Sequence, residues 1–450
     1  MQEAGCTDQV GAAKAFAPLG LGTLATRSLT ESGAVGAPGA VIEISSDQAP
    51  WIAVQPESPL RIGLPAAVEP GAGVLAVAFD GDLYYPVGRL ADGDPAGVEV
   101  SWLPEPAPAV TGRRDLGGAI RLYLYKTFGL STPTLGLHHA RFVEAAAAAG
   151  NPVGDGERVD AVEGGELRYR AVRPGELARG GRVAVFVHGF TSDTHWLIAT
   201  GVELLRRHGI AYDHVLSFDY ETVRTGIAAN GEALADALHL AGLGPDDGAR
   251  VDVFAHSMGT QVVRAMIELF GGAAYVDRAF LAGPPNDGTA IARVKRPVVW
   301  LATLLLNQAG PTPPALLANW ALGHVADHVA GLDDLAPGSP FYNRLNDPAL
   351  PGPGAYHVVI GRNELRPEAQ TAWARVARRL GDRTDALLDL VLRGDNDLVI
   401  AVHSARALER LRPAGRVTVS EVPCDHFGYF STAAASARIV ALAGGAAPGG

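Results

Sequence analysis

The stretch "VDVFAHSMG", at positions 251–259, places a single serine directly after an apolar run. Small residues, Ala255 and Gly259, stand two positions to either side of Ser257, and apolar residues at helical spacing follow from 260 to 270. A strand that enters a helix through a tight turn of small residues lifts the serine hydroxyl out of the backbone. We therefore predict that Ser257 is a nucleophile. The alternative that this stretch alone leaves open is a serine that only caps the helix.

Apolar strands alternate with helical stretches on both sides of this serine. The strand-like runs are "RVAVFVHGF" (182–190), "DHVLSFDY" (213–220), "VDRAFLAGPP" (276–285), "AYHVVIG" (355–361) and "RVTVSEV" (416–422). This alternation predicts an α/β fold, a mostly parallel sheet flanked by helices, over residues 161–440. A Pro-rich insertion interrupts it at about 287–350.

The chain before residue 161 has a different rhythm. Residues 1–30 are expected to form a flexible arm, and 31–112 a smaller β-rich accessory domain, because short apolar runs there are broken by Gly, Pro and Asp. Residues 113–160 are expected to form a helical connector, since "LGGAIRLYLYKTFGL" and "LHHARFVEAAAAAG" carry apolar residues at helical spacing or are rich in alanine. Residues 441–450 are expected to be a flexible tail.

The bulk composition excludes several classes of protein. In 450 residues, 48% are hydrophobic and 19% charged, which is enough apolar material for a large core in two or three domains. The net charge of −11 and the absence of a Lys/Arg run argue against nucleic-acid binding. Cys6 and Cys424 are too few for a disulfide framework. No apolar run reaches the roughly 18 residues that a membrane span requires, and no signal peptide is recognised, so a cytoplasmic location is expected.

Several motifs of the second half resemble those of the α/β-hydrolase superfamily, in particular its lipase and esterase-like serine hydrolases. They are "HGF" (188–190), "AHSMG" (255–259), "GPPNDGT" (283–289), "LDDLAPGSPFYNRLN" (332–346), "NDLV" (396–399) and "DHF" (425–427). The resemblance covers about 60% of the chain, from about 165 to 440. The sequence departs from the G-x-S-x-G pattern of that superfamily at Ala255.

The resemblance implies a catalytic triad and an oxyanion hole. His426 follows the last strand, where the general base is expected, and completes the order Ser, Asp, His along the chain. Asp397 is favoured over Asp395 as the acid, because its turn resembles the acid-bearing turn of lipases. The backbone N–H groups of Phe190 and Met258 are then expected to bind the oxyanion.

The substrate-binding residues expected from these motifs lie in two places. One is the loop that contains His188 and Gly189. The other is the apolar stretch "PVVWLATLLL" (297–306), which is expected to cover the serine as a lid and to line an acyl pocket or meet a lipid surface. Its predicted substrate-facing residues are Trp300, Leu301, Leu304 and Leu305.

The predicted function is hydrolysis of carboxylic esters without a cofactor. No metal site is expected, because the histidines beside His or Asp lack a third ligand at metal-site spacing. Two alternatives remain open: an amide or thioester hydrolase with the same triad, and a binding module whose N-terminal domain docks a protein partner of unknown kind.

Overall fold

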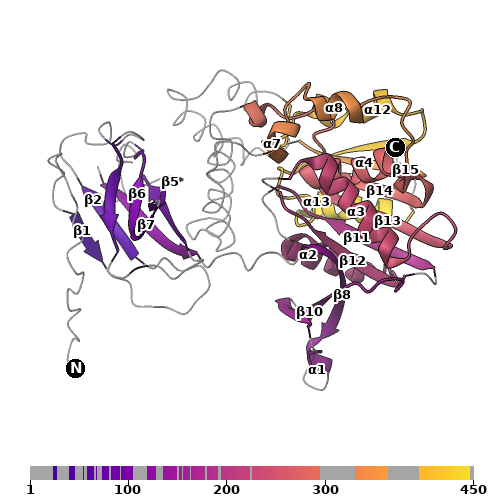
Figure 1. Ribbon diagram of the computed structural model, residues 1–450, viewed down its shortest axis with the longest axis horizontal. Helices are drawn as coiled ribbons and strands as arrows, with labels where there is room; N and C mark the ends of the chain where they lie inside the picture. The colour runs from indigo at the N-terminus through magenta and orange to yellow at the C-terminus, as the bar shows by residue number, and fades with distance from the viewer. Residues whose placement is uncertain are drawn as a thin grey trace. The chain divides into compact units, whose positions relative to one another are not determined.

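The computed structural model describes residues 24–27, 40–45, 54–104, 119–127, 135–190, 194–293, 330–362 and 395–445, with short gaps inside some of these ranges. The chain divides into two compact units, which are described one at a time. The first contains the described strands up to β7, and the second contains the described elements from β8 onward (Figure 1).

The first unit is an antiparallel sheet in the order β1-β2-β7-β4-β5-β6-β3. Its strands are β1 (Leu24–Arg27), β2 (Ala40–Ser45), β3 (Leu60–Gly63), β4 (Gly73–Phe79), β5 (Tyr84–Ala91), β6 (Asp94–Val100) and β7 (Ala119–Thr127). The β4–β5 turn is closed by Asp80, whose carboxylate accepts hydrogen bonds from the Leu83 N–H (2.8 Å) and the Tyr85 hydroxyl (3.2 Å). A separate β-rich unit is therefore present, as the sequence predicts, but it extends beyond the predicted bounds of 31–112. Strand β1 lies within residues 1–30, which are expected from the sequence to form a flexible arm, because pairing with β2 orders it, and β7 lies beyond residue 112.

The prediction of a helical connector over 113–160 is wrong. Residues 119–127 form strand β7, which pairs with β2 and β4, and Gly136–Glu144 forms strand β8, which pairs with β10 and β12. Among the β7 side chains whose burial the structure describes, Ile120, Leu122 and Leu124 are buried and Tyr123 is half-buried, which fits a period of two. A short apolar run fits the period of a helix as well as that of a strand. Because β2 and β4 complete the backbone hydrogen bonds of β7, the tertiary context selects the strand. Helix α1 contains only Ala145–Ala148.

The second unit is built on a nine-stranded, mostly parallel sheet in the order β16-β15-β14-β13-β11-β12-β8-β10-β9. The strands from β16 to β12 in this order are parallel, and β8, β10 and β9 are added antiparallel at one edge. Beyond β8, they are β9 (Arg158–Val162), β10 (Gly165–Ala171), β11 (Gly181–Val187), β12 (His214–Asp219), β13 (Ala249–His256), β14 (Val276–Ala282), β15 (Ala355–Gly361) and β16 (Val417–Val422). The predicted α/β architecture is confirmed.

Helices connect these strands, as the alternation in the sequence predicts. The longer ones are α2 (Thr194–Arg207), α3 (Ile227–Ala241), α4 (Met258–Leu269) and α13 (Ala433–Ala443). The short ones are η2 (Gly272–Ala274), η3 (Ala290–Arg293), α7 (Ala330–Asp334), α8 (Pro340–Leu345), α11 (Val402–Ala405) and α12 (Ala407–Leu411). Helices α2 and α13 share one apolar core with the sheet, and α3 and α4 pack against each other (Figure 1). The stretch "AQTAWARVARRLG" (369–381), whose pattern predicts a further helix, lies outside the described residues.

A column of stacked rings runs across the central strands on the face covered by α2 and α13. Phe186, Phe254, Phe280 and His357 occupy matching positions on β11, β13, β14 and β15. Their ring centroids are 5.1, 4.5 and 4.9 Å apart in that order. Parallel strands in register place equivalent side chains next to one another on one face of the sheet. The stacked rings therefore stabilise the packing of the central strands against each other.

None of the helices in the described ranges has both the length and the apolar content needed to cross a bilayer.

We expect Phe254→Ala to lower the free energy of unfolding of the second unit by about 3–5 kcal/mol, because it leaves a cavity in the middle of the stacked column. Phe254 is fully buried. Urea denaturation followed by circular dichroism would measure the change. Leu240→Ala is the matched control, since Leu240 is 63% exposed and should change stability by less than about 0.5 kcal/mol. Equal effects of the two substitutions would contradict the role of the column.

Candidate active site

Ser257 occupies the turn between β13 and α4 in a conformation that is rare for a non-glycine residue. Its φ is 52° and its ψ −126°. Such a backbone costs about 1–3 kcal/mol and persists only where the surroundings hold it. Here the Ser257 N–H donates to the carbonyl of Ala282 (3.0 Å), and the Thr260 hydroxyl donates to the Ser257 carbonyl (2.6 Å). The turn is therefore fixed from both sides.

Gly259 is required by the close approach of two chain segments. A Cβ atom at this position would lie 2.1 Å from the carbonyl oxygen of His188 and 2.6 Å from that of Val187. Helix α4 thus begins in direct contact with the end of β11. The other small residue of the motif, Ala255, is fully buried in β13, which shows that a methyl group fits where the lipase-like pattern has glycine.

The structure brings Ser257, His426 and Asp397 together from three separate parts of the chain. The Ser257 Oγ lies 2.8 Å from the Nε2 of His426, and the Nδ1 of His426 lies 2.8 Å from the Oδ2 of Asp397. His426 and Asp397 are almost completely buried. The His426 backbone N–H also donates to the Asp397 carbonyl, at 2.7 Å. One aspartate therefore holds both the ring and the backbone of the histidine.

The carboxylate of Asp397 is surrounded by hydrogen-bond donors. Its Oδ1 accepts the backbone N–H groups of Val399 (3.0 Å) and Ile400 (2.7 Å) across a turn in which Leu398 has a φ of 87°. Its Oδ2 accepts the Tyr429 hydroxyl at 2.7 Å in addition to His426. Burial alone would raise the pKa of Asp397, but His426 and these donors outweigh burial and leave the pKa below its ordinary value. Asp397 therefore stays ionised.

Tyr429 is a site residue that the sequence analysis missed. It is fully buried, and its hydroxyl also accepts the Gly361 N–H at 2.7 Å. This oxygen therefore links the end of β15 to Asp397. The available signal was its position three residues after His426 in "DHFGYF", but nothing in the sequence shows that its hydroxyl faces the acid.

The alternative acid, Asp395, lies away from the histidine. Its side chain is 66% exposed and pairs with Arg362 at 3.1 Å. Its backbone carbonyl accepts the Val402 N–H and so helps to close the acid-bearing turn. The geometry thus separates the two aspartates that the sequence left open.

The loop after β11 approaches Ser257 closely. A Cβ at Gly189 would lie only 2.9 Å from the Ser257 Cβ. The carbonyl of His188 accepts the Tyr220 hydroxyl at 2.6 Å, and the buried His188 ring stacks on Tyr220 with centroids 4.4 Å apart. The backbone and the ring of His188 therefore both hold the loop against Tyr220. Its predicted contact with substrate, like that of Gly189, stays a prediction.

The two residues predicted to bind an oxyanion flank the same serine. Phe190 follows Gly189 in this loop, and Met258 is the first residue of α4. The first N–H groups of a helix have no partner within the helix, and they carry the positive end of its dipole. That these two N–H groups bind an oxyanion is taken up below as part of the proposed function.

Trp300, Leu301, Leu304 and Leu305 lie outside the described residues, so their role as a lid stays a prediction. Within the described ranges, no group of three or more His, Cys, Asp or Glu side chains is arranged to hold a metal ion.

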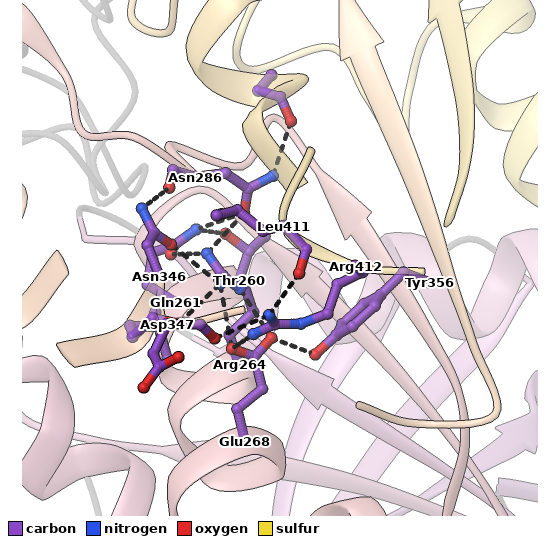
Figure 2. A network of polar contacts seen from close by, with 12 residues as sticks. Thr260, Gln261, Arg264, Glu268, Asn286, Asn346, Asp347, Tyr356, Leu411 and Arg412 are labelled. Carbon is purple, nitrogen blue, oxygen red and sulfur yellow. Dashed lines mark hydrogen bonds and ion pairs between the residues drawn. The ribbon is translucent and has the colours of Figure 1, made fainter. Parts of the chain in front are cut away.

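A buried polar network lies along α4, the helix that directly follows Ser257 (Figure 2). Arg264 donates two hydrogen bonds to Glu268, at 3.0 and 3.1 Å. Arg412, which follows α12, also pairs with Glu268, and the Tyr356 hydroxyl of β15 donates to the same carboxylate. Burial and the charge on Glu268 raise the pKa of Tyr356, so its hydroxyl remains a donor.

Asn286 connects this network to the loop after β14. Its side-chain oxygen accepts from Arg264 and Gln261, each at 3.3 Å, and its side-chain nitrogen donates to the Ala405 carbonyl at 2.7 Å. Asn346 donates to the Asn286 carbonyl at 3.0 Å (Figure 2). The motifs "GPPNDGT" and "LDDLAPGSPFYNRLN" therefore supply residues that fasten α4 to its neighbours.

One protein-family model matches the second half of the chain. Residues 163–443 match the model described as "Domain of unknown function (DUF7379)". The match spans more than half of the chain, and the protein therefore belongs to this family. No curated protein matches the sequence.

Several solved structures are similar to the chain at low identity. A lipase from Bacillus licheniformis, BlEst2 in its mature form, is 16% identical over 62% of this chain and 94% of its own, with a TM-score of 0.36. An alpha/beta hydrolase fold protein from Chitinophaga pinensis is 12% identical over 61% and 91%, with a TM-score of 0.37. A thermophilic esterase from Thermogutta terrifontis is 14% identical over 64% and 96%, with a TM-score of 0.34. What this chain does has to follow from its own side chains.

We expect Glu268→Gln to lower the free energy of unfolding by about 3–5 kcal/mol, because it leaves the buried guanidinium groups of Arg264 and Arg412 without their shared carboxylate. Thermal and urea denaturation would measure the loss. Glu232→Gln is the matched control, since Glu232 is an exposed residue of α3. A variant that is as stable as the control would show that the network does not depend on the charge.

Proposed function

We propose that this protein is a serine hydrolase of the α/β-hydrolase type that cleaves carboxylic esters. The observation that carries the proposal is the continuous relay from Ser257 through His426 to Asp397, with both hydrogen bonds at 2.8 Å. A serine in a strained turn, a buried histidine and an ionised aspartate at these distances form the arrangement that nucleophilic acyl transfer requires.

The proton positions follow from the partners of His426. Ionised Asp397 can only accept a hydrogen bond, so the Nδ1 of His426 carries the proton that it donates to Asp397. The Nε2 of His426 then remains free to accept the proton of Ser257. As Ser257 attacks the ester carbonyl carbon, His426 becomes an imidazolium, which Asp397 stabilises at contact distance. His426 then protonates the departing alcohol, which leaves the acyl group on Ser257. Water, deprotonated by His426, releases the acid by the same route.

The negative charge of the tetrahedral intermediate is assigned to the N–H groups of Met258 and Phe190. Support comes from the close packing of Gly189 on Ser257 and of Gly259 on the end of β11. These two contacts hold the loop after β11 against the serine and the start of α4 against the end of β11. Donors fixed in this way stabilise the oxyanion without a reorganisation cost.

We expect Ser257→Ala to reduce hydrolysis of p-nitrophenyl acetate and butyrate by about 10⁴- to 10⁶-fold in kcat, because the nucleophile is lost. Labelling by a fluorophosphonate probe should disappear with it. Ser436→Ala is the matched control, since the Ser436 hydroxyl donates to the backbone carbonyls of Thr432 and Ala433 at the start of α13.

Wild-type protein that neither reacts with the probe nor cleaves these esters would contradict the proposal and favour a binding role for the fold. Cleavage of p-nitroanilides or thioesters in preference to esters would move the protein to the amide or thioester class with the same triad.

We expect Asp397→Asn to lower kcat by about 10⁴-fold, because the amide cannot stabilise the imidazolium or select the required tautomer. Asp395→Asn should change kcat by less than about threefold, because Asp395 pairs with Arg362 at the surface. Steady-state kinetics on p-nitrophenyl butyrate would measure both. The opposite ranking would assign the acid to Asp395.

A further inference from the structure

His256 directly precedes Ser257, and the proposed mechanism gives it no part. It ends β13, on the same face of the sheet as Phe254, because side chains two apart on a strand share a face. It is 4% exposed. A polar ring in this position, buried and adjacent to the nucleophile, requires a physical explanation.

One edge of the His256 ring holds the backbone of His426. The His256 Nε2 lies 2.7 Å from the His426 carbonyl oxygen. A carbonyl can only accept, so Nε2 carries the proton and donates it. Since the His426 N–H donates to the Asp397 carbonyl at 2.7 Å, the peptide groups on both sides of the His426 Cα are fixed. The two imidazole rings are 4.9 Å apart, centroid to centroid.

The other edge of the ring lies against the loop after β11. A Cβ at Gly189 would be 3.1 Å from the His256 Nδ1 and 2.9 Å from the Ser257 Cβ. The ring therefore fills the space between the loop that carries His426 and the loop that carries the predicted oxyanion donor Phe190. Its width sets how far apart these two loops stand.

His256 stays uncharged while it does this. Burial and the neighbouring charge of His426 lower the pKa of His256 to about 3, against the smaller opposing effects of the His426 carbonyl and Asp397. The ring therefore keeps one proton, on Nε2, over the whole neutral range. A second positive charge beside the imidazolium of His426 would oppose proton transfer from Ser257, and the neutral ring avoids it.

We propose that His256 is a positioning residue that holds the His426 backbone through its Nε2–H and spaces it from the oxyanion loop. This inference rests on the proposed function, because it concerns the alignment of His426 with Ser257. A displacement of catalytic groups by about 1 Å can reduce a rate by about 100-fold.

The test compares three substitutions of His256 in the full-length protein. His256→Leu replaces the imidazole with an apolar side chain and so removes the donor. His256→Gln places an amide N–H near the original Nε2, whereas His256→Asn has an amide on a side chain that is too short to reach this position. Active sites are titrated with a fluorophosphonate, and kcat and KM for p-nitrophenyl butyrate are given per titrated site, so that loss of folded protein is not counted. His357→Leu is the matched control, because His357 is a histidine of the same sheet with a pKa lowered by burial to about 4 and stacks on Phe280.

We expect His256→Leu and His256→Asn to lower kcat per site by about 10- to 100-fold with KM changed by less than about threefold. His256→Gln should recover most of kcat, and His357→Leu should leave it unchanged. If His256→Leu does not fold, the difference between the Gln and Asn variants still decides. Equal kcat per site in those two variants, or an unchanged kcat in the Leu variant, would overturn the inference. A wild-type protein without probe labelling would instead overturn the proposed function.

Discussion

The left-handed backbone of Ser257 is the constraint on which the rest of the site depends. A φ of 52° at a residue with a side chain is unfavourable by itself, and a short peptide would relax it. The turn persists because β13 pairs with β11 on one side and β14 on the other. In addition, the Ala282 carbonyl accepts a hydrogen bond from the Ser257 N–H, and Gly259 allows α4 to start against the end of β11. The sheet thus stores the strain that exposes the hydroxyl.

The buried charged residues in the second half of α4 hold in place the helix that follows the Ser257 turn. A helix that follows a strained residue has to be fixed in position, or the turn would relax by moving it. Arg264 and Glu268 lie on the second and third turns of α4, and their partners come from β15 and from the segments after α8 and α12. Buried ion pairs add little net stability against apolar packing, but their directional hydrogen bonds require these partners to occupy defined places. We interpret the network as a device for orientation more than for stability.

The histidine and the aspartate are held in a comparable way, by contacts to the backbone as well as to the side chains. Asp397 accepts two N–H groups within its own turn, which is strained at Leu398, and its carbonyl holds His426. Tyr429 and His256 add a hydroxyl and an imidazole N–H that reach the same two residues. The side chains of Asp397, His426, Tyr429 and His256 are buried and each makes a hydrogen bond within the site. The site is therefore ordered before any substrate arrives, which is the condition for electrostatic stabilisation of a transition state.

The sequence by itself determined the parallel α/β sheet, the separate β-rich unit and the places of Ser257 and His426 at the ends of strands, because strand–turn–helix patterns and the order of polar residues at strand ends are local signals. It favoured Asp397 over Asp395 only through the resemblance of its turn to the acid-bearing turn of lipases, since both residues lie in one loop and only the fold shows which carboxylate faces the histidine. It mistook β7 and β8 for helices, because neighbouring strands outweighed local periodicity. Tyr429, His256 and the distant partners of Glu268 also needed the tertiary structure, because contacts between residues 32 to 170 positions apart leave no pattern in a single sequence.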